Sequence, residues 1–478
     1  MLKKTLLLLL ATLGMLSQTQ AYTPKSPYEI HVHLKGVTDT NILLAHHFAD
    51  KKYVDDTNRV DHNGWGVFKG DSLLGGIYLI AIPGMTYFEI IVSENEPKFT
   101  VETDKADFVM NMKVTGSPEN QMFYDYLQYI SPNNIKVGAY NNRILALKDN
   151  KAMKDSVDYY NNKIKALNEA NMAYEKDLID KHPNFFISHL LNMMMDVVPP
   201  PTPTTLHGDD SLYFAYNYTK KHFWDKTDFC DHRILRTPVL KSKIDFYLDK
   251  ISSPIPDSLI ISSNLIIHKS ECDREVFKYC VVYLTNRFET SQVMCQENVF
   301  VNLAINYYLS GKAYWADTGI MRKINDRVSK LKYCDCNTTA VEMSLPDSSG
   351  TYHSLHAMPN DITVLYFFAD DCSHCKETTP HMDSIYQIYS KKGIGFYAVD
   401  ILRDRKNWLD FVHHYKLTWL NVWDPMNTTN FRFFYDIYST PVVYVLDKDK
   451  KIIGKRIDWK QLPGFLDHLI DENKKQKK

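Results

Sequence analysis

Two cysteines separated by two residues directly follow an apolar segment, and this arrangement constrains the fold more than any other feature of the chain. The apolar segment spans residues 362–369 and predicts a buried strand, and Cys372 and Cys375 come at the expected start of a helix. A helix N-terminus presents unpaired N–H groups and a positive dipole potential, which stabilise a thiolate. We therefore predict that Cys372 attacks a substrate disulfide and that Cys375, one turn inside the helix, resolves the mixed disulfide.

Three further residues occur in the order that a known active site requires. Pro380 lies five residues after the second cysteine, and Thr440 and Pro441 precede an apolar strand at residues 442–446. With these residues, the segment resembles a thioredoxin active site, and the C-terminal region resembles the TlpA and ResA-like thioredoxin-fold oxidoreductases. The resemblance implies that Pro380 kinks the helix and that Thr440 and Pro441 form the cis-proline loop, which holds an extended substrate segment beside the dithiol.

The residues around the first cysteine depart from that family. Asp370 and Asp371 precede Cys372, where thioredoxins usually have an aromatic residue, and two nearby carboxylates would raise the pKa of the thiol. His374 acts in the opposite direction, because a partly charged imidazole favours the ionised thiol. The motif therefore leaves the direction of electron transfer open.

The position that holds a buried acid in thioredoxins also differs. That acid stands six residues before the first cysteine, where this chain has Tyr366. Asp400, at the end of the next predicted strand, either reaches the site from another direction or caps a loop. We favour the loop cap.

The pattern of apolar residues predicts three domains after the N-terminal leader. Residues 22–115 alternate apolar and polar positions between turn-like groups and predict a small antiparallel β domain. Residues 116–335 show helical spacing, interrupted by a proline-rich connector at 199–203, and predict a helical domain. Residues 336–478 alternate strands and helices and predict the thioredoxin fold. The predicted fold class is therefore multidomain, α+β and α/β, and the first two domains resemble accessory domains of exported Bacteroidota proteins.

Residues 1–21 have the features of a secretory signal peptide. Lys3 and Lys4 precede an apolar run at 5–16 that is too short to span a bilayer, and residues 19–21 offer a cleavage site. The alternative is an uncleaved anchor. We expect export to the periplasm and no stable membrane insertion after signal cleavage, because no other stretch is long and apolar enough.

The charge balance and the histidines argue against two classes of ligand. The chain has 56 Lys+Arg and 57 Asp+Glu, so no net field attracts nucleic acid. Three pairs of neighbouring histidines lack a third ligand at suitable spacing, which favours surface or core roles over a metal site; they are His31 with His33, His46 with His47, and His413 with His414. We expect no cofactor.

Six more cysteines would meet an oxidising compartment after export. Cys280 lies on an apolar helical stripe and is expected in the core. Cys334 and Cys336 are a strained distance apart for a mutual bridge; they are either a second redox pair or, as we favour, structural residues at the domain junction. Cys230, Cys272 and Cys295 are either core residues or members of bridges that the sequence does not assign.

Together these features predict an exported thiol-disulfide oxidoreductase that reduces or exchanges disulfides in client proteins. Its partners would be proteins with disulfides or thiols and a separate redox partner protein. The alternative is a binding or assembly protein that uses the thioredoxin fold as a docking platform. Replacing Cys372 would abolish the first function and leave the second intact.

Overall fold

The computed structural model describes residues 27–476 except 85, 148–152 and 292, so the predicted signal peptide lies outside the described residues. The chain forms two compact units. The first comprises the residues up to 195 together with 233–240, and the second comprises 196–232 together with 241 onward. The predicted helical region thus contributes to both units, and the predicted domain boundaries stay predictions.

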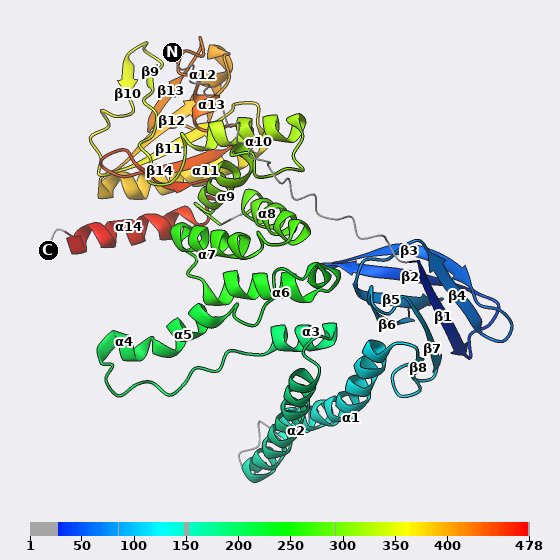
Figure 1. Cartoon of the computed structure of the whole chain (residues 1–478). Helices are drawn as coiled ribbons and strands as arrows, with labels where there is room; N and C mark the ends of the chain where they lie inside the picture. The colour runs from blue at the N-terminus through cyan, green and yellow to red at the C-terminus, as the bar shows by residue number, and fades with distance from the viewer. Residues whose placement is uncertain (1–26, 85, 148–152, 292, 477–478) are drawn as a thin grey trace, which may run out of the picture. The chain divides into compact units, whose positions relative to one another are not determined.

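The first unit contains two four-stranded sheets, with strand orders β4-β1-β7-β8 and β3-β2-β5-β6 (Figure 1). The strands are β1 (Tyr28–Lys35), β2 (Asn41–Phe48), β3 (Lys51–Arg59), β4 (Trp65–Gly70), β5 (Gly76–Ile82), β6 (Thr86–Val92), β7 (Lys98–Asp104) and β8 (Lys113–Thr115). Alternation along β1 buries Ile30, Val32 and Leu34, as period-two patterning requires. The predicted N-terminal β domain is confirmed, although β1 and β7 pair in parallel rather than antiparallel.

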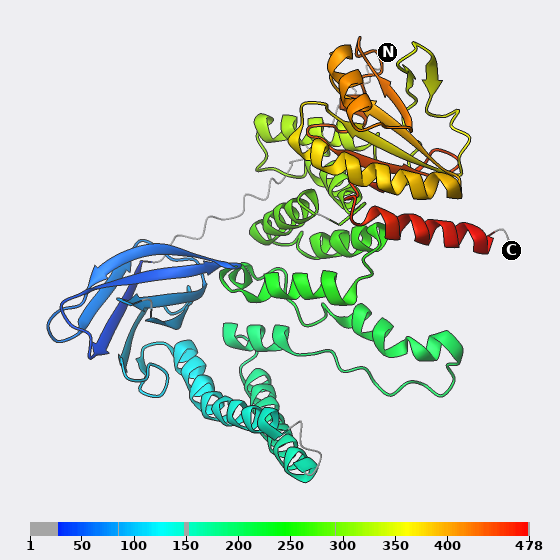
Figure 2. The same cartoon turned by 180° about the vertical axis from the view of Figure 1, so that it is seen from behind.

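Three helices complete this unit: α1 (Pro118–Leu147), α2 (Lys154–Lys181) and α3 (Phe186–Met194). The long helices α1 and α2 run side by side (Figures 1 and 2), and the rings of Tyr129 and Tyr174 stack between them at 4.1 Å. Residues 233–240 return to this unit, where the Ala49 N–H donates to the Leu235 carbonyl and the Arg233 guanidinium lies over the Phe186 ring.

The second unit begins with a helical region. Its helices are α4 (Gly208–Leu212), α5 (Phe214–His222), α7 (Pro256–Lys269), α8 (Arg274–Glu289), α9 (Glu297–Leu303) and α10 (Thr318–Leu331), with the π-helical segments η3 (Tyr247–Ile251) and η4 (Ala304–Leu309). The 3-10 helix η2 (His232–Arg236) lies almost entirely in the segment 233–240 of the first unit, and α6 (Val239–Phe246) begins in that segment and continues into the second unit. Asp273 caps α8 by accepting from the N–H groups of Glu275 and Val276. The predicted stripe on α8 is buried, including Cys280, which confirms its place in the core.

The rest of this unit is a five-stranded sheet with the order β13-β12-β11-β14-β15. Its strands are β11 (Ile362–Phe368), β12 (Ile394–Asp400), β13 (Leu420–Trp423), β14 (Val442–Leu446) and β15 (Ile452–Lys455), preceded by the hairpin β9 (Ser344–Pro346) and β10 (Tyr352–Ser354). The helices are α11 (Ser373–Tyr389), α12 (Arg405–His414), α13 (Phe431–Phe434) and α14 (Leu462–Gln476), with the turn η5 (Ser390–Lys392).

Helices cover both faces of this sheet. Every residue of β11 is buried, as its uninterrupted apolar sequence predicts for a central strand. On one face Phe368 stacks with Phe411 of α12, and on the other Phe367 stacks with Phe431 of α13. The predicted mixed α and β fold with a C-terminal thioredoxin-like domain is therefore confirmed. None of the helices in the described part of the chain is long and apolar enough to cross a membrane.

Candidate functional site

The cysteine pair lies where β11 ends and α11 begins. Cys372 is the N-cap residue of α11 and is partly exposed, whereas Cys375 is completely buried. The Cys375 N–H donates to the Cys372 sulfur at 3.3 Å, and the Cys372 thiol donates to the Thr440 carbonyl at 3.3 Å. The two sulfurs are thus presented differently, one to solvent and one to the protein interior.

The surroundings also separate the acidities of the two thiols. Burial alone would raise the pKa of Cys372, but hydrogen bonds from the Cys375 thiol and from N–H groups of the first turn outweigh it, so the pKa is lowered. Burial, reinforced by the Cys372 sulfur, raises the pKa of Cys375. Cys372 is therefore the sulfur that ionises first, despite the carboxylates of Asp370 and Asp371 beside it.

The loop before β14 lies against the cysteine pair. The Thr440–Pro441 peptide bond is cis, and the Thr440 carbonyl contacts the Cys372 sulfur. A groove of about 180 Å³ runs along this loop and is lined by Pro441, by Thr378 of α11 and by Trp459. The structure thus brings Thr440 and Pro441 together with the dithiol, and their substrate-holding role stays a prediction.

The His374 side chain is exposed on the first turn of α11. The group of His374 that lowers the pKa of Cys372 is its backbone N–H. Any residue at this position other than proline would supply that N–H. The predicted effect of the imidazole on the thiolate stays a prediction.

Two buried carboxyls lie beside the site. The Asp400 side chain is completely buried, and it accepts a hydrogen bond from the Leu402 N–H at 2.8 Å, which is the expected loop cap. Asp400 also interacts with Asp370, which is 8% exposed. Burial, together with the charges of Asp370 and Asp371, raises the pKa of Asp400 to about 7.

Sequence reasoning missed this carboxyl pair, although a signal for it was present. Asp400 lies opposite Phe368 in the parallel pairing of β11 and β12, so both strands end at the same edge of the sheet. Asp370 follows Phe368 by two residues and comes to the same edge. Tyr366, at the position of the thioredoxin acid, is buried, and its hydroxyl lies 3.2 Å from the Thr379 hydroxyl.

The remaining cysteines resolve into two bridges and two buried thiols. The bridges are Cys230–Cys272 and Cys295–Cys336. Cys334 and Cys280 are free and completely buried. Cys336 therefore pairs with a partner other than its neighbour, and Cys334 lies in the interior at the junction between the helices and the sheet.

Four of the histidines expected at the surface or in the core, His31, His33, His46 and His47, have acidic neighbours, and His413 and His414 are exposed at the end of α12. His33 hydrogen-bonds Glu102 at 2.9 Å and His46 hydrogen-bonds Asp55 at 2.7 Å. Across the ranges that the structure describes, no group of three or more histidine, cysteine or acidic side chains is placed to hold a metal ion.

Two family models match the second unit. Residues 336–455 match the AhpC/TSA family, and residues 203–333 match a domain of unknown function (DUF5106). Among curated proteins, the thiol-disulfide oxidoreductase ResA of Geobacillus thermodenitrificans is 27% identical over 115 residues, and ResA of Geobacillus kaustophilus is 25% identical over the same length. Each match covers 24% of this chain and 65% of the relative.

Solved structures from Bacteroidota are also similar. A domain of a possible thiol-disulfide isomerase from Cytophaga hutchinsonii is 39% identical, with 29% of this chain and 96% of that chain covered and a TM-score of 0.28. A thioredoxin-like protein from Bacteroides caccae is 18% identical, with 57% and 98% covered and a TM-score of 0.45. The AhpC/TSA match and the ResA relatives support the predicted resemblance of the C-terminal domain to the TlpA/ResA-like thioredoxin-fold thiol-disulfide oxidoreductases.

Proposed function

We propose that this protein is an exported thiol-disulfide oxidoreductase that reduces or exchanges disulfides in client proteins through Cys372 and Cys375. The observation that carries the proposal is the N-cap position of Cys372, where a partly exposed sulfur receives an N–H hydrogen bond and has a lowered pKa. A solvent-accessible thiolate is the form that attacks a disulfide.

The reaction would proceed in two exchanges. The Cys372 thiolate attacks one sulfur of a client disulfide, the client S–S bond breaks, and the second client sulfur leaves as a thiolate and takes up a proton. Cys375, which its raised pKa keeps protonated until then, loses its proton to solvent and attacks the Cys372 sulfur. The mixed disulfide between Cys372 and the client breaks, and the first client sulfur leaves as a thiolate and takes up a proton. The client gains two electrons and two protons, and Cys372 and Cys375 form a disulfide that a separate redox partner protein reduces again.

The groove along the cis-proline loop supports a role in holding the client. It opens beside Pro441, and its walls include Trp459 and Thr378 of α11. The ring of His381 stacks on the Trp459 indole at 3.8 Å, which fixes the orientation of this wall. An extended client segment that lies in this groove would have its disulfide within reach of the Cys372 sulfur.

Two features support export to the periplasm. Residues 1–21 have the charge and apolar pattern of a cleavable signal, and the described residues contain two disulfides. Disulfides persist in oxidising compartments and are rare in the cytosol. Fractionation of cells that carry the native gene, followed by N-terminal sequencing, tests this assignment, because a cytosolic protein with an intact leader would contradict it.

The enzymatic proposal is tested by reduction of insulin with dithiothreitol as the electron source. We expect Cys372→Ser to lower the rate to that of dithiothreitol alone, and Cys375→Ser to accumulate a mixed disulfide detectable by mass. Cys280→Ala is the control, because it removes a buried free thiol of α8 and keeps the activity. A wild-type rate no higher than that of dithiothreitol alone would favour the docking-platform alternative, and full activity in Cys372→Ser would assign the reaction to other cysteines.

Equilibration with dithiothreitol and glutathione buffers measures the direction of electron flow. A reduction potential near about -270 mV would indicate a reductase, and one near about -120 mV would indicate an oxidant that introduces disulfides into clients. A pair that does not exchange in native buffer would overturn the enzymatic proposal.

A further inference from the structure

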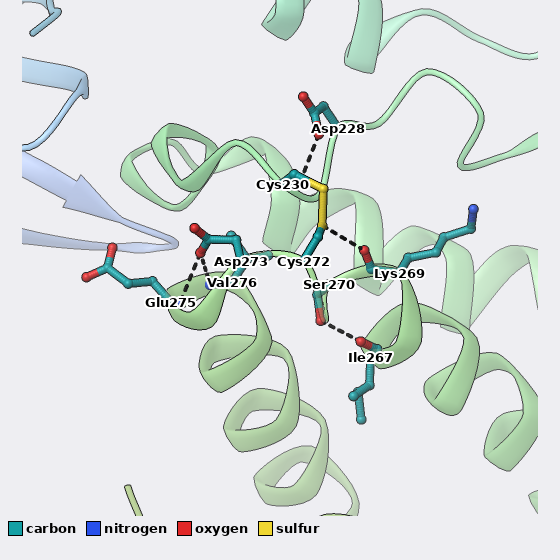
Figure 3. Close-up of a disulfide and its surroundings, with 9 residues drawn as sticks. All are labelled: Asp228, Cys230, Ile267, Lys269, Ser270, Cys272, Asp273, Glu275 and Val276. Carbon is teal, nitrogen blue, oxygen red and sulfur yellow. Dashed lines mark hydrogen bonds between the residues drawn. A yellow bond between two sulfur atoms is a disulfide. The ribbon is translucent and has the colours of Figure 1, made fainter. Parts of the chain in front are cut away.

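The Cys230–Cys272 disulfide lies on the surface of the helical region. Both cysteines are exposed, and neither belongs to a helix: Cys230 follows a loop after α5, and Cys272 lies in the turn between α7 and α8. Figure 3 shows the bridge between the Asp228 loop and this turn, with the Cys272 sulfur 3.6 Å from the Lys269 carbonyl oxygen. An attacking thiol can therefore reach either sulfur from solvent.

The second bridge of this unit provides an internal comparison. Cys295–Cys336 closes a loop with a sequence separation of 41, against 42 for Cys230–Cys272. Cys336 is only 9% exposed and Cys295 is partly buried, whereas both cysteines of the first bridge are exposed. The two bridges constrain the chain over nearly equal lengths and differ in their access to solvent.

The loops that the exposed bridge joins have other anchors. Phe229, next to Cys230, is 3% exposed and packs against the Trp224 ring at 5.3 Å. The Cys230 N–H donates to Asp228 in its own loop at 2.9 Å. On the other side, Ser270 caps α7 through the Ile267 carbonyl and Asp273 caps α8 (Figure 3). Opening the bridge would thus leave the packed core and both helix ends in place.

We propose that Cys230–Cys272 is a second thiol-disulfide exchange site, which thiols reduce while the fold stays intact. A thiolate of a dithiol attacks one exposed sulfur, the Cys230–Cys272 bond breaks, and the other sulfur leaves as a thiolate and takes up a proton. The second thiol of the dithiol then loses its proton and attacks the first, the mixed disulfide breaks, and the protein sulfur leaves as a thiolate and takes up a proton. The bridge gains two electrons and two protons, and the dithiol becomes a disulfide. Exposed disulfides are the ones that behave in this labile way.

The charges near the bridge favour some thiols over others. Asp228, Asp231, Glu271 and Asp273 lie within two residues of the two cysteines in sequence. The positive charges are those of Arg274 at the same distance, of Lys269 beside Cys272 and of Lys312, which pairs with Glu271. The excess of carboxylates repels a thiol that carries further negative charge. We therefore expect dithiothreitol to open the bridge faster than glutathione at equal thiolate concentration, and added salt to narrow the difference.

The first experiment uses the whole mature chain as Cys372→Ser/Cys375→Ser, so that its outcome does not depend on the proposed enzymatic function. The protein is exposed to dithiothreitol in native buffer, samples are alkylated over time, and each bridge is followed by peptide mass. We expect Cys230 and Cys272 to be alkylated on the order of 100-fold faster than Cys295 and Cys336, because Cys336 is buried and Cys295 partly buried, so that a local opening favours attack on that bridge. Circular dichroism should stay unchanged while the exposed bridge opens.

Two controls decide the outcome. In denaturant both bridges should open at similar rates, which shows that access and not intrinsic reactivity separates them. Equal rates in native buffer, or opening of Cys230–Cys272 only with loss of structure, would overturn the proposal.

A second experiment identifies the source of the thiol. Reduced wild-type chain is mixed with a tagged Cys372→Ser/Cys375→Ser acceptor, and the acceptor bridge is followed by mass. Faster opening than with an equal concentration of dithiothreitol would assign the dithiol of a second copy as donor. Opening by small thiols alone would support the exchange site with low-molecular-weight thiols as its reductants, and opening by neither would contradict it.

Discussion

Two places in the second unit hold closely spaced cysteines, and they treat the sulfur in opposite ways. Cys372 stands at the N-terminus of α11, is partly exposed and has a lowered pKa. Cys334 follows the C-terminal end of α10, donates its thiol toward the Lys330 carbonyl at 3.8 Å, and has a pKa raised by burial. Both cysteines have another cysteine close in sequence, so this spacing does not explain the difference in pKa. The position at the N-terminal or C-terminal end of a helix and the access to water explain it.

The surroundings of the two places differ in the same sense. Around Cys334 the interior holds paired charges: Asp436 is completely buried and accepts from Arg327 at 2.6 Å and from Arg456 at 2.9 Å. Lys455, whose side chain is 2% exposed, forms an ion pair with Glu297 of α9. These pairs and the Cys295–Cys336 bridge link the helical region to the sheet through buried side chains, whereas the Cys372 sulfur is partly exposed.

The largest expected effect is on thiol reactivity. With the dithiol reduced, we expect iodoacetamide at neutral pH to modify Cys372 on the order of 100-fold or more faster than Cys334, because only the thiolate reacts. Peptide mass mapping over time measures both rates in one sample. In guanidinium chloride the two rates should converge, and a persistent difference there would remove the structural explanation.

The second prediction concerns the Cys295–Cys336 bridge. The loop-closure model assigns about 4 kcal/mol of stabilisation to a bridge of this loop length. Cys295→Ala/Cys336→Ala should therefore lower the free energy of unfolding by about 4 kcal/mol, measured by urea denaturation followed by tryptophan fluorescence. The matched variant Cys230→Ala/Cys272→Ala removes a bridge that closes a loop of nearly equal length. It should lower the free energy of unfolding by no more than this amount. A larger loss of stability on removal of Cys230–Cys272 would contradict the view that the Cys295–Cys336 bridge is the more important one for the fold.

The third prediction concerns the ions of the junction. Asp436→Ala leaves two guanidinium groups without their shared partner, and we expect a loss of about 3 kcal/mol, toward the lower end for a broken buried pair because both arginines are partly exposed. Asp326→Ala is the control, since its pair with Lys330 lies at the surface and should contribute less than about 1 kcal/mol. Equal losses in the two variants would show that the junction ions are solvated.

The fourth prediction concerns a pH dependence at the dithiol site. Burial raises the pKa of Asp400 to about 7, against about 3.9 in the unfolded chain. The folded state therefore binds the proton more tightly, so this contribution to stability is fully present below about pH 4 and is lost as the pH rises through about 7. The slope in this window should approach about 1.4 kcal/mol per pH unit, and Asp400→Asn should flatten it. Urea denaturation at a series of pH values measures the slope, and an unchanged slope in the variant would assign it to another group.

The central strand and the dithiol could be predicted from the sequence because their signals are local. The apolar run of β11 and the spacing of Cys372, Cys375 and Pro441 are written in consecutive or regularly spaced residues. The Asp370–Asp400 pair depends on which strands are neighbours, and the Cys295–Cys336 bridge depends on which of several cysteines meet. Both are properties of the folded chain, which the residue pattern does not contain.

The sequence pattern also did not predict that residues 233–240 pack with the first unit. Eight residues with ordinary composition give no boundary signal, and their place is decided by contacts such as that of Arg233 with Phe186. The proline-rich connector at 199–203, by contrast, could be read directly from the sequence, because proline excludes helix and central strand.

That return has a consequence for how the protein can be divided. The chain crosses between the two units after residues 195, 232 and 240, so no single cut yields two complete pieces. A truncation that begins at the second unit's first residue still carries a fragment of the first, and a protein that ends before residue 233 lacks part of its own first unit. Inheritance of the two units as separable modules would therefore require the exchange of an internal segment as well as an end.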